Sequence, residues 1–378
     1  MNRMIFISPF SLGTRGGGGL ACLAYYNALR KVYPGDVELA QPEEACIGDF
    51  SNAIPIPARS RSQAILSGCM HRYKSFVKDF LKENGHKYTH AVLNGGFYFG
   101  DSISEFNKRG IKVVMIHHNY EKEYSVTNKT IFSLYGFFPY LVSRNEKRAY
   151  LKSDINCFLT KNDKDAFIQE YGTTDIPSYL ISVFDCEHTA HVPSKESCSD
   201  KWVITGTLSD FQTYNSIMLF KEKFYPHLIE LLPNHRLTIA GRNPGEQINS
   251  FRNQYSSSIV VLPNPENMDE VLDDNAIFLC PTSSGSGQKL RVMDGLRKGM
   301  PILVHEVSSR GYDMFFDSPF FKVYNDEDSF KKGVIDIINA MKSNTQYKED
   351  IIALYNRYLS FEAGVDRFKL VIDELLSS

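Results

Sequence analysis

The sequence predicts an α/β protein made of two doubly wound, Rossmann-like domains that face a cleft between them. Short apolar segments of strand length alternate with helical patterns along the chain, and this alternation is typical of parallel sheets covered by helices. The chain has 378 residues, which suits two domains of about 150 to 200 residues each better than one core. A polar stretch from Asp185 to Lys201 interrupts the alternation, so we expect a linker there.

The predicted strands and helices follow one another in a regular order. The predicted strands cover Met4–Ser8, Ala91–Leu93, Lys112–Ile116, Ile155–Leu159, Tyr179–Val183, Trp202–Thr205, Arg236–Ala240, Ile259–Leu262, Ile277–Cys280 and Ile302–Val304. The predicted helices include Leu20–Lys31, Gln63–Glu83, Thr213–Leu231, Gln288–Lys298 and Glu362–Leu376. We therefore expect a first domain over residues 1–185, a linker over 186–200 and a second domain over 201–357. A final helix within 358–378 could pack back on the first domain.

Composition and charge exclude several classes of protein. Hydrophobic residues make up 43% and charged residues 23% of the chain, which are values of a globular protein rather than a disordered or fibrous one. The net charge of −2 argues against broad nucleic-acid binding. The seven cysteines are scattered and show no C-x-x-C spacing, so we expect reduced thiols and neither a disulfide frame nor a zinc site.

The apolar run at the start of the sequence is short, and no later segment reaches the roughly 18 apolar residues that a membrane span needs, so we expect neither a signal peptide nor a transmembrane helix. We therefore expect a cytoplasmic protein. Any contact with a membrane would be peripheral, at its inner face.

The stretch from Ala276 to Val304 carries the strongest indication of a ligand site. It predicts a buried strand, a turn of small residues over Pro281–Gly287, a helix from about Gln288 and a second strand. A helix start presents unpaired backbone N–H groups and favours negative charge, and cationic side chains there are unfavourable unless an anion offsets them. This corner therefore predicts a cradle for a phosphate group.

The residues predicted to form this cradle are Ser284, Gly285, Ser286, Gly287, Lys289 and Arg291. Asp294 follows on the same helix and could reach a ribose hydroxyl. The alternative is a glycine loop in front of an ordinary solvated helix.

Four consecutive glycines, Gly16 to Gly19, separate the first predicted strand from the first helix. Gly16, Gly17 and Gly18 would let the backbone approach a ligand closely and present amides at a helix start. The spacing does not match G-x-G-x-x-G, because Ala21 stands where the third glycine belongs, so a dinucleotide site is poorly supported. A flexible surface turn is the alternative.

Two adjacent histidines, His117 and His118, come directly after the apolar strand Lys112–Ile116. Polar groups at the carboxyl end of a strand project into the crevice of such a sheet, where a histidine can bond a sugar hydroxyl or carry a proton. One histidine of such a pair usually packs away, and we prefer His118 as the functional one. No metal-ligand spacing accompanies them, so a metal site is not expected.

Two further turns lie at strand ends of the second domain. Gly206 and Thr207 follow its first strand and would allow close approach of a nucleotide. Asn215 could equally cap the next helix. Arg242, after the strand Arg236–Ala240, could contact phosphate or base, or could be a solvated arginine at a loop tip.

The first domain also contains basic and aromatic segments. The basic residues are Arg59, Arg61, His71, Arg72, Lys74 and Lys78, and the aromatic run covers residues 131–141. A basic amphipathic surface beside exposed aromatic side chains can lie on an anionic bilayer. Aromatic runs are also common in protein cores, so both interpretations stay open.

Taken in order, six segments resemble the retaining glycosyltransferases of the GT-B fold, specifically family 4 (glycosyl transferases group 1). These segments are the strand with its glycine loop (Ile5–Gly19), His-Asn-x-Glu (His118–Glu121), E-x(7)-D-aliphatic (Glu146–Ile155), G-x-L…N (Gly206–Asn215), A-G-x-x-P (Ala240–Pro244) and the long helix motif Gly285–Ile302. No single segment is specific, but their common order is.

The resemblance implies a nucleoside diphosphate sugar bound mainly to the second domain and a glycan or lipid-linked acceptor bound to the first. It implies transfer of a hexose-type sugar with retention of configuration, without metal or cofactor, in surface polysaccharide biosynthesis. The catalytic residues would be His118, Lys289 and Arg291. The donor-binding residues would be Gly16, Gly17, Gly18, Gly206, Thr207, Arg242, Ser284, Gly285, Ser286, Gly287 and Asp294.

The chain departs from the family pattern at two places. The family usually has two glutamates eight positions apart, whereas Ser286 and Asp294 occupy these positions here. The usual Arg and Lys pair after the first strand of the second domain is missing from Ser209–Thr213, which leaves Lys289 and Arg291 to balance the diphosphate charge. Two alternatives stay open, a nucleotide-sugar epimerase of the same architecture and a non-catalytic nucleotide-sugar-binding homologue.

Overall fold

The computed structural model describes residues 3–12, 14, 16–57, 71–127, 138–194 and 198–377. The chain divides into two compact units. Unit 1 comprises Met1–Thr189 and Ser360–Ser378, and unit 2 comprises Ala190–Leu359. The last helix therefore belongs to unit 1, although unit 2 precedes it in the sequence.

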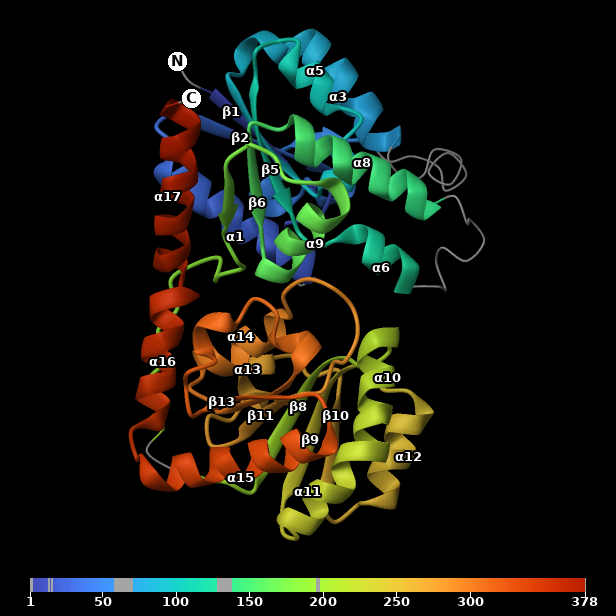
Figure 1. Cartoon of the computed structure of the whole chain (residues 1–378), viewed down its shortest axis with the longest axis vertical. Helices are drawn as coiled ribbons and strands as arrows, with labels where there is room; N and C mark the ends of the chain where they lie inside the picture. Colours follow the sequence, from blue (N-terminus) through green and yellow to red (C-terminus); the bar gives the residue numbers. More distant parts are fainter. Residues whose placement is uncertain are drawn as a thin grey trace. The chain divides into compact units, whose positions relative to one another are not determined.

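Unit 1 is built on a seven-stranded parallel sheet with the order β3-β2-β1-β4-β5-β6-β7 (Figure 1). The strands are β1 (Arg3–Ile7), β2 (Asp36–Pro42), β3 (Ile54–Ile56), β4 (His90–Asn94), β5 (Lys112–His117), β6 (Ile155–Phe158) and β7 (Ser178–Leu180). The helices are α1 (Gly17–Val32), α3 (His71–Asn84), α4 (Gly96–Phe99), α5 (Ile103–Asn107), α6 (Glu121–Thr127), α8 (Phe138–Lys152), α9 (Lys161–Tyr171) and α17 (Phe361–Ser377). Strands β4 and β6 are buried along their whole length, as expected for a parallel sheet that helices cover on both faces.

Helix α17 packs against α1 within unit 1 (Figure 1). The ring centroid of Phe368 lies 5.3 Å from that of Tyr25 on α1 and 5.9 Å from that of Phe184. Arg367 Nε donates a hydrogen bond to the carbonyl oxygen of Ile181 at 2.8 Å. A Cβ atom at Gly364 would lie 2.1 Å from the ring of Phe184, so glycine lets the helix approach this closely.

Unit 2 contains a six-stranded parallel sheet with the order β10-β9-β8-β11-β12-β13. The strands are β8 (Lys201–Thr207), β9 (Arg236–Arg242), β10 (Ile259–Pro263), β11 (Ile277–Cys280), β12 (Ile302–His305) and β13 (Phe321–Tyr324). The helices are α10 (Phe211–Leu219), the π-helical turn Phe220–Phe224, α11 (Tyr225–Leu231), α12 (Glu246–Gln254), α13 (Met268–Val271), α14 (Leu290–Arg297), α15 (Glu327–Ser343) and α16 (Tyr347–Tyr358).

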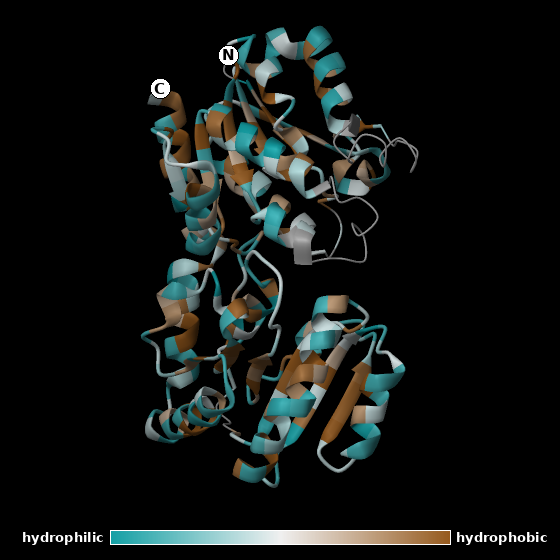
Figure 2. Ribbon diagram, turned by 45° about the vertical axis from the view of Figure 1, so that its right-hand side comes forward, coloured by the Kyte–Doolittle hydropathy of each residue, from teal (hydrophilic) through white to brown (hydrophobic). Residues whose placement is uncertain are grey.

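Helices α14 and α15 cover opposite faces of this sheet. A Cβ at Gly295 of α14 would meet Ile302 of β12, and a Cβ at Gly333 of α15 would meet Leu303, the next residue of the same strand. Consecutive strand residues point to opposite faces. Figure 2 shows the consequence in unit 2, where apolar strands lie behind helices whose outer sides are hydrophilic.

Three strands were not predicted from the sequence, and one predicted helix is broken. Strands β2, β3 and β13 are short or carry polar residues, such as Gln41 in β2 and Lys322 in β13, so they lack the apolar runs of the central strands. The predicted helix Thr213–Leu231 contains the π-helical turn, and Pro226 stands at the start of α11 directly after it. Proline cannot donate the helical hydrogen bond, which accounts for the break.

None of the helices in the described ranges combines the length and apolar character needed to cross a bilayer.

Candidate functional site

The sheet of unit 2 has its topological switch point between β8 and β11. The chain order runs outward from β8 through β9 and β10 on one side and from β11 through β12 and β13 on the other. Ligands of doubly wound sheets bind outside the carboxyl ends of the strands at this point. Strand β8 leads to α10, and β11 leads through residues Pro281–Arg291 into α14. This segment, called the 281–291 loop below, is therefore placed where the topology favours a ligand.

Hydrogen bonds fix the 281–291 loop on two sides. The backbone N–H of Ser283 donates to Ser216 Oγ of α10 at 3.0 Å. On the other side, Ser308 Oγ donates to the carbonyl oxygen of Thr282 at 2.6 Å, and the Tyr312 hydroxyl donates to that of Lys289 at 2.8 Å. The loop is thus held in one conformation by side chains of neighbouring elements.

Lys289 and Arg291 lie at the start of α14, as the sequence indicated, but the helix begins at Leu290 and Lys289 takes the N-cap position. Arg291 Nη1 donates to the carbonyl oxygen of Thr205 on β8 at 3.0 Å, and its Nη2 donates to Thr213 Oγ1 on α10 at 3.2 Å. The Lys289 ammonium donates to the carbonyl oxygen of Ser286 at 2.8 Å. Two cations therefore meet at the carboxyl edge of the sheet.

Arg310 was not predicted from the sequence, yet it belongs to the same edge. It follows the short 3-10 helix Glu306–Ser309 after β12, and its Nη1 lies 3.5 Å from the carbonyl oxygen of Gly285. No motif surrounds Arg310 in the sequence, and only the order of strands brings it to the 281–291 loop. The edge thus carries a third cation.

Two glycines of this edge leave space for side chains of the protein itself. A Cβ at Gly206 would lie 2.5 Å from Arg291 Nη1, so Gly206 makes room for the guanidinium group. Gly285 has φ +95°, and a Cβ there would lie 2.6 Å from Gln212 Oε1 of α10. The close approach of a nucleotide to Gly206, expected from the sequence, stays a prediction.

Ser286 is 7% exposed, and its hydroxyl oxygen has no hydrogen-bond partner within the part of the chain that the structure describes. Its neighbours Ser284 and Gly287 belong to the same loop, and Gly287 has φ +70°, a conformation that glycine adopts most readily. A buried hydroxyl without a partner has lost its hydration without compensation. Ser286 is therefore a group that a ligand could satisfy.

The other predicted donor-binding residues of unit 2 lie nearby at strand ends or on α14. Thr207 and Arg242 are paired in the register of β8 and β9, and Arg242 is exposed. Asp294 lies on α14 with 44% of its side chain exposed and 3.6 Å from Arg297 Nη2. The structure gathers these residues at one edge and leaves their individual roles as predictions.

His117 is the last residue of strand β5 in unit 1, and His118 follows it directly; their side chains contact different parts of the unit. His117 Nε2 lies 2.9 Å from Asn156 Oδ1, and the His117 ring stacks on Phe158 with centroids 4.9 Å apart. His118 Nε2 lies 3.2 Å from Asn94 Oδ1 and 3.7 Å from Cys22 Sγ on α1. His117 is therefore a core residue, whereas His118 lies beside the start of α1.

His118 is only 6% exposed. Burial lowers the pKa of His118 to about 4 and that of His117 to about 4, so both rings are neutral near neutral pH. Burial also raises the pKa of the Cys22 thiol to about 12, which keeps it protonated. His118 and Cys22 are therefore neutral hydrogen-bonding groups at this edge of unit 1.

The glycine turn of unit 1 is closely packed at Gly18, whereas Gly16 and Gly17 are exposed. Gly16 is the N-cap residue of α1, and Gly17 and Gly18 form its first turn. A Cβ at Gly18 would lie 2.9 Å from the ring of Phe10, and that ring lies 5.5 Å from the His118 ring, centroid to centroid. Gly16 to Gly18 and His118 are therefore neighbours within unit 1.

A pair of glutamates, the buried Glu146 and the partly buried Glu121, was not predicted from the sequence. Glu146 of α8 is 1% exposed and accepts hydrogen bonds from the backbone N–H groups of Glu121 and Lys122 at 2.8 and 3.2 Å and from the Tyr171 hydroxyl at 3.1 Å. Burial, followed by repulsion from Glu121, raises the pKa of Glu146 to about 8, and burial raises the pKa of Glu121 as well. Glu146 holds the turn that follows His118 against α8.

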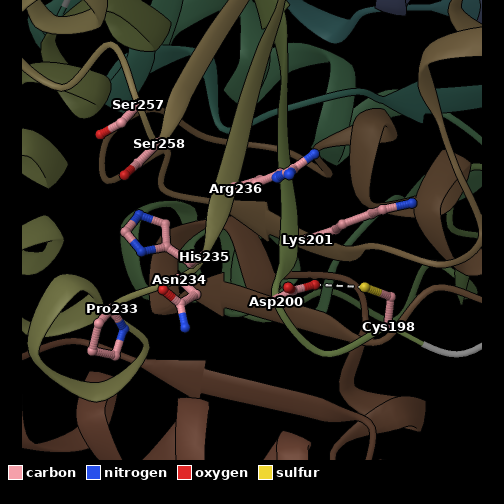
Figure 3. Close-up of a pocket in the computed structure, with 9 residues that line it drawn as sticks. All are labelled: Cys198, Asp200, Lys201, Pro233, Asn234, His235, Arg236, Ser257 and Ser258. Carbon is pink, nitrogen blue, oxygen red and sulfur yellow. Dashed lines mark hydrogen bonds between the residues drawn. The ribbon is translucent and has the colours of Figure 1, made fainter.

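A hollow of about 570 Å³ lies at the amino-terminal edge of the unit 2 sheet, and Figure 3 shows the residues that line it. Lys201 and Arg236 line it at the starts of β8 and β9, and the Cys198 thiol donates to the Asp200 carboxylate within it. None of the predicted site residues lines this hollow. It lies at the end of the sheet opposite to the 281–291 loop, so topology does not favour it as the principal ligand site.

Part of the basic and aromatic surface expected from the sequence cannot be placed. Arg59, Arg61 and residues 131–137 lie outside the described residues, as do the side chains of His71 and Arg72. Lys74 and Lys78 are exposed on α3. Within the described ranges, no three His, Cys, Asp or Glu side chains gather in a way that could hold a metal ion.

No family model matches the sequence. A curated relative, an uncharacterized 44.6 kDa protein in the cps region of Klebsiella pneumoniae, is 24% identical over 251 residues. The match covers 63% of this chain, and the chain spans only 61% of that relative's length.

Solved structures resemble the fold over the whole chain. Anabaena HepE in complex with UDP has a TM-score of 0.69 at 11% identity and covers 100% of both chains. A glycosyltransferase from Rickettsia africae has a TM-score of 0.67 at 10% identity, with 100% of this chain and 99% of that one covered. The lipopolysaccharide outer core galactosyltransferase WaaB has a TM-score of 0.64 at 10% identity, with 99% of each chain covered. These neighbours are GT-B glycosyltransferases, and the predicted fold class, two parallel-sheet α/β domains of the GT-B type, is confirmed.

Proposed function

We propose that this protein is a glycosyltransferase that moves a hexose-type sugar from a nucleoside diphosphate sugar to a glycan or lipid-linked acceptor. We further propose that transfer proceeds with retention of configuration and without a metal ion, and that it serves surface polysaccharide biosynthesis at the cytoplasmic face of a membrane. The 281–291 loop of unit 2 would hold the donor, and the edge of unit 1 around His118 would meet the acceptor.

One observation carries the proposal. Arg291 bridges the end of β8 and the start of α10 at the switch point of unit 2, with Lys289 beside it at the start of α14. A planar guanidinium group held in this way suits the oxygens of a phosphate group. Backbone amides at a helix start favour the same anion. A diphosphate is thus the ligand whose charge this edge complements.

The chemistry follows from the charge that develops during transfer. When the bond between the sugar and the diphosphate breaks, negative charge grows on the departing phosphate. Cations already aimed at that position stabilise the charge without rearranging first. Lys289 and Arg291 would supply these cations, while the neutral His118 ring would bond an acceptor or sugar hydroxyl rather than act as a charged group.

The similar proteins support a sugar-transfer function, although their names do not identify the substrates of this chain. Anabaena HepE was solved with UDP, with UDP and glucose, and with UDP-glucose. WaaB is named as a galactosyltransferase of the lipopolysaccharide outer core, and the curated relative lies in a cps region. These names favour a sugar nucleotide as the donor and a surface glycan as the product.

A single set of incubations tests the proposal. The protein is mixed with UDP-hexoses alone and with a panel of glycan and lipid-linked acceptors, and the products are followed by mass spectrometry. Acceptor-dependent loss of the hexose from UDP supports transfer. Epimerised nucleotide sugar in the absence of acceptor would identify an epimerase, and donor binding without any turnover would identify a binding homologue.

A further inference from the structure

We infer that the outer face of α8, together with Lys74 of α3, is a docking surface for an anionic lipid bilayer. This inference concerns a surface of unit 1 outside the candidate site and does not depend on the transfer reaction. The docking surface is defined by Lys74, Tyr140, Arg144, Lys147 and Arg148.

The exposed charges of α8 are all positive. Arg144, Lys147 and Lys152 are exposed, and Arg148 keeps 38% of its side chain exposed. The helix contains one acid, Glu146, which is 1% exposed and faces the interior of unit 1. The outer face of α8 is therefore cationic in a protein whose net charge is −2.

Three of these cations surround a single carboxylate. Arg148 contacts Asp101 Oδ1, Arg144 Nη2 lies 3.9 Å from the same oxygen, and Lys74 Nζ lies 3.9 Å from Asp101 Oδ2. Three positive charges against one negative charge leave a surplus of two. The cations also stay accessible, with 56% of the Lys74 and 45% of the Arg144 side chain exposed. Helices α3 and α8, labelled in Figure 1, thus converge on a site of excess positive charge.

An aromatic side chain stands at one end of this row. Tyr140 is 61% exposed in the first turn of α8, and Tyr140, Arg144 and Arg148 follow at a spacing of four residues, which places them on one helix face. Tyrosine is enriched where an apolar ring meets headgroups. A helix face with one aromatic residue and several cations complements a planar surface of lipid phosphates.

Sedimentation with vesicles tests this docking surface without donor or acceptor. The full-length protein should sediment with vesicles of phosphatidylcholine and about 30% phosphatidylglycerol but not with pure phosphatidylcholine, and about 0.5 M salt should release it. Each cation near an anionic bilayer raises partitioning about fivefold. Arg144→Glu with Arg148→Glu should therefore lower binding at least about 25-fold, and Tyr140→Ser by several-fold.

A matched control separates this surface from net charge. Lys161→Glu with Lys164→Glu makes the same change in charge on α9 and should alter binding less than about twofold. Because Arg148 contacts Asp101, Arg144→Glu with Lys147→Glu serves as a second variant that leaves this ion pair in place.

Three results would overturn the inference. The α9 control could lose as much vesicle binding as the α8 variant, or salt could leave vesicle binding unchanged. The protein could also bind a single-stranded RNA oligonucleotide in preference to anionic vesicles. Loss of sugar transfer with intact vesicle binding would count against the proposed function alone.

Discussion

The two units share the strand order 3-2-1-4-5-6, to which unit 1 adds a seventh strand, yet the candidate binding groups at the carboxyl edges of their sheets differ in charge. At the unit 1 edge, His118, Asn94 and Cys22 are buried and uncharged near neutral pH. At the unit 2 edge, the 281–291 loop contributes Lys289 and Arg291, and Arg310 lies beside it. Strand order decides where a ligand site can form in such a sheet. The side chains at that edge then decide whether the site suits an anion or a neutral, hydroxyl-bearing group.

Removing the cations of unit 2 should produce the largest effect. Lys289→Ala with Arg291→Ala removes two charge-assisted contacts of about 1.5 to 3 kcal/mol each, so affinity for UDP-glucose should fall at least about 100-fold. Isothermal titration calorimetry measures this loss. Arg297→Ala, at the other end of α14 and paired with Asp269 at 3.2 Å, should leave the affinity nearly unchanged.

Thermal unfolding of each variant checks that the fold survives, because Arg291 also bonds Thr205 and Thr213. If both positions can be changed in a folded protein with unchanged nucleotide affinity, the distinction between the two edges fails.

In unit 1, the buried carboxyl group of Glu146 should make the free energy of unfolding depend on pH. The pKa of Glu146 is raised to about 8 from 4.5. Its contribution to stability is therefore fully present below about pH 4.5 and is lost as pH rises through about 8. Between pH 5 and 7 the free energy of unfolding should fall by about 2.5 kcal/mol through this group. Glu146→Gln should abolish this slope in urea-unfolding curves.

Glu105 provides the control for that experiment. Hydrogen bonds from Lys108 and then Arg109 lower the pKa of Glu105, so this carboxyl group stays ionised throughout the same pH range. The difference in unfolding free energy between wild type and Glu105→Gln should stay constant from pH 5 to 7. A slope that persists in Glu146→Gln would mean that another group binds the proton.

Replacing His118 and His117 separately compares two adjacent histidines that differ in their contacts. His118→Asn should lower kcat about 30-fold, equivalent to about 2 kcal/mol, while the dissociation constant of the donor stays unchanged. Because the pKa of His118 is lowered to about 4, its titration should not shape the pH–rate profile between pH 6 and 8. The stability that neutral His118 contributes is lost as pH falls from about 6.5 through 4.

His117→Asn should affect stability rather than catalysis. It should lower the free energy of unfolding and leave kcat of the folded protein unchanged, because the His117 ring packs on Phe158 in the core. If the two variants lower kcat equally, the different contacts of the two histidines have no functional meaning.

The layers of the fold could be predicted because the central strands are apolar runs. Strand Ile277–Cys280 was predicted with the bounds that the structure has. Strand β2 was not predicted, because Glu38 and Gln41 interrupt its apolar pattern. It forms a strand because it pairs with β1 in the sheet, not because of its local composition. Apolar periodicity therefore identifies the centre of a parallel sheet better than its edges.

The site could be predicted in position but not in its contacts. Glycine and serine between a strand and a helix marked the 281–291 loop, since small residues and turns are local signals. The partner of Arg291, Thr205, lies 86 residues away, and Glu121 and Glu146 meet across 25 residues. Such contacts depend on the order of strands and the packing of helices, which a single sequence does not specify.

Ser286 offers the smallest expected effect and the sharpest test of what the unit 2 edge binds. Its hydroxyl oxygen is buried without a hydrogen-bond partner in the described ranges, so Ser286→Ala should leave the free energy of unfolding unchanged or slightly higher. If the hydroxyl bonds the donor, affinity for UDP-glucose should fall about fivefold, or about 1 kcal/mol. Ser216→Ala is the control, because Ser216 Oγ accepts from the loop backbone and its loss should lower stability. Stability and affinity that change together in Ser286→Ala would mean that the hydroxyl supports the loop and does not meet the ligand.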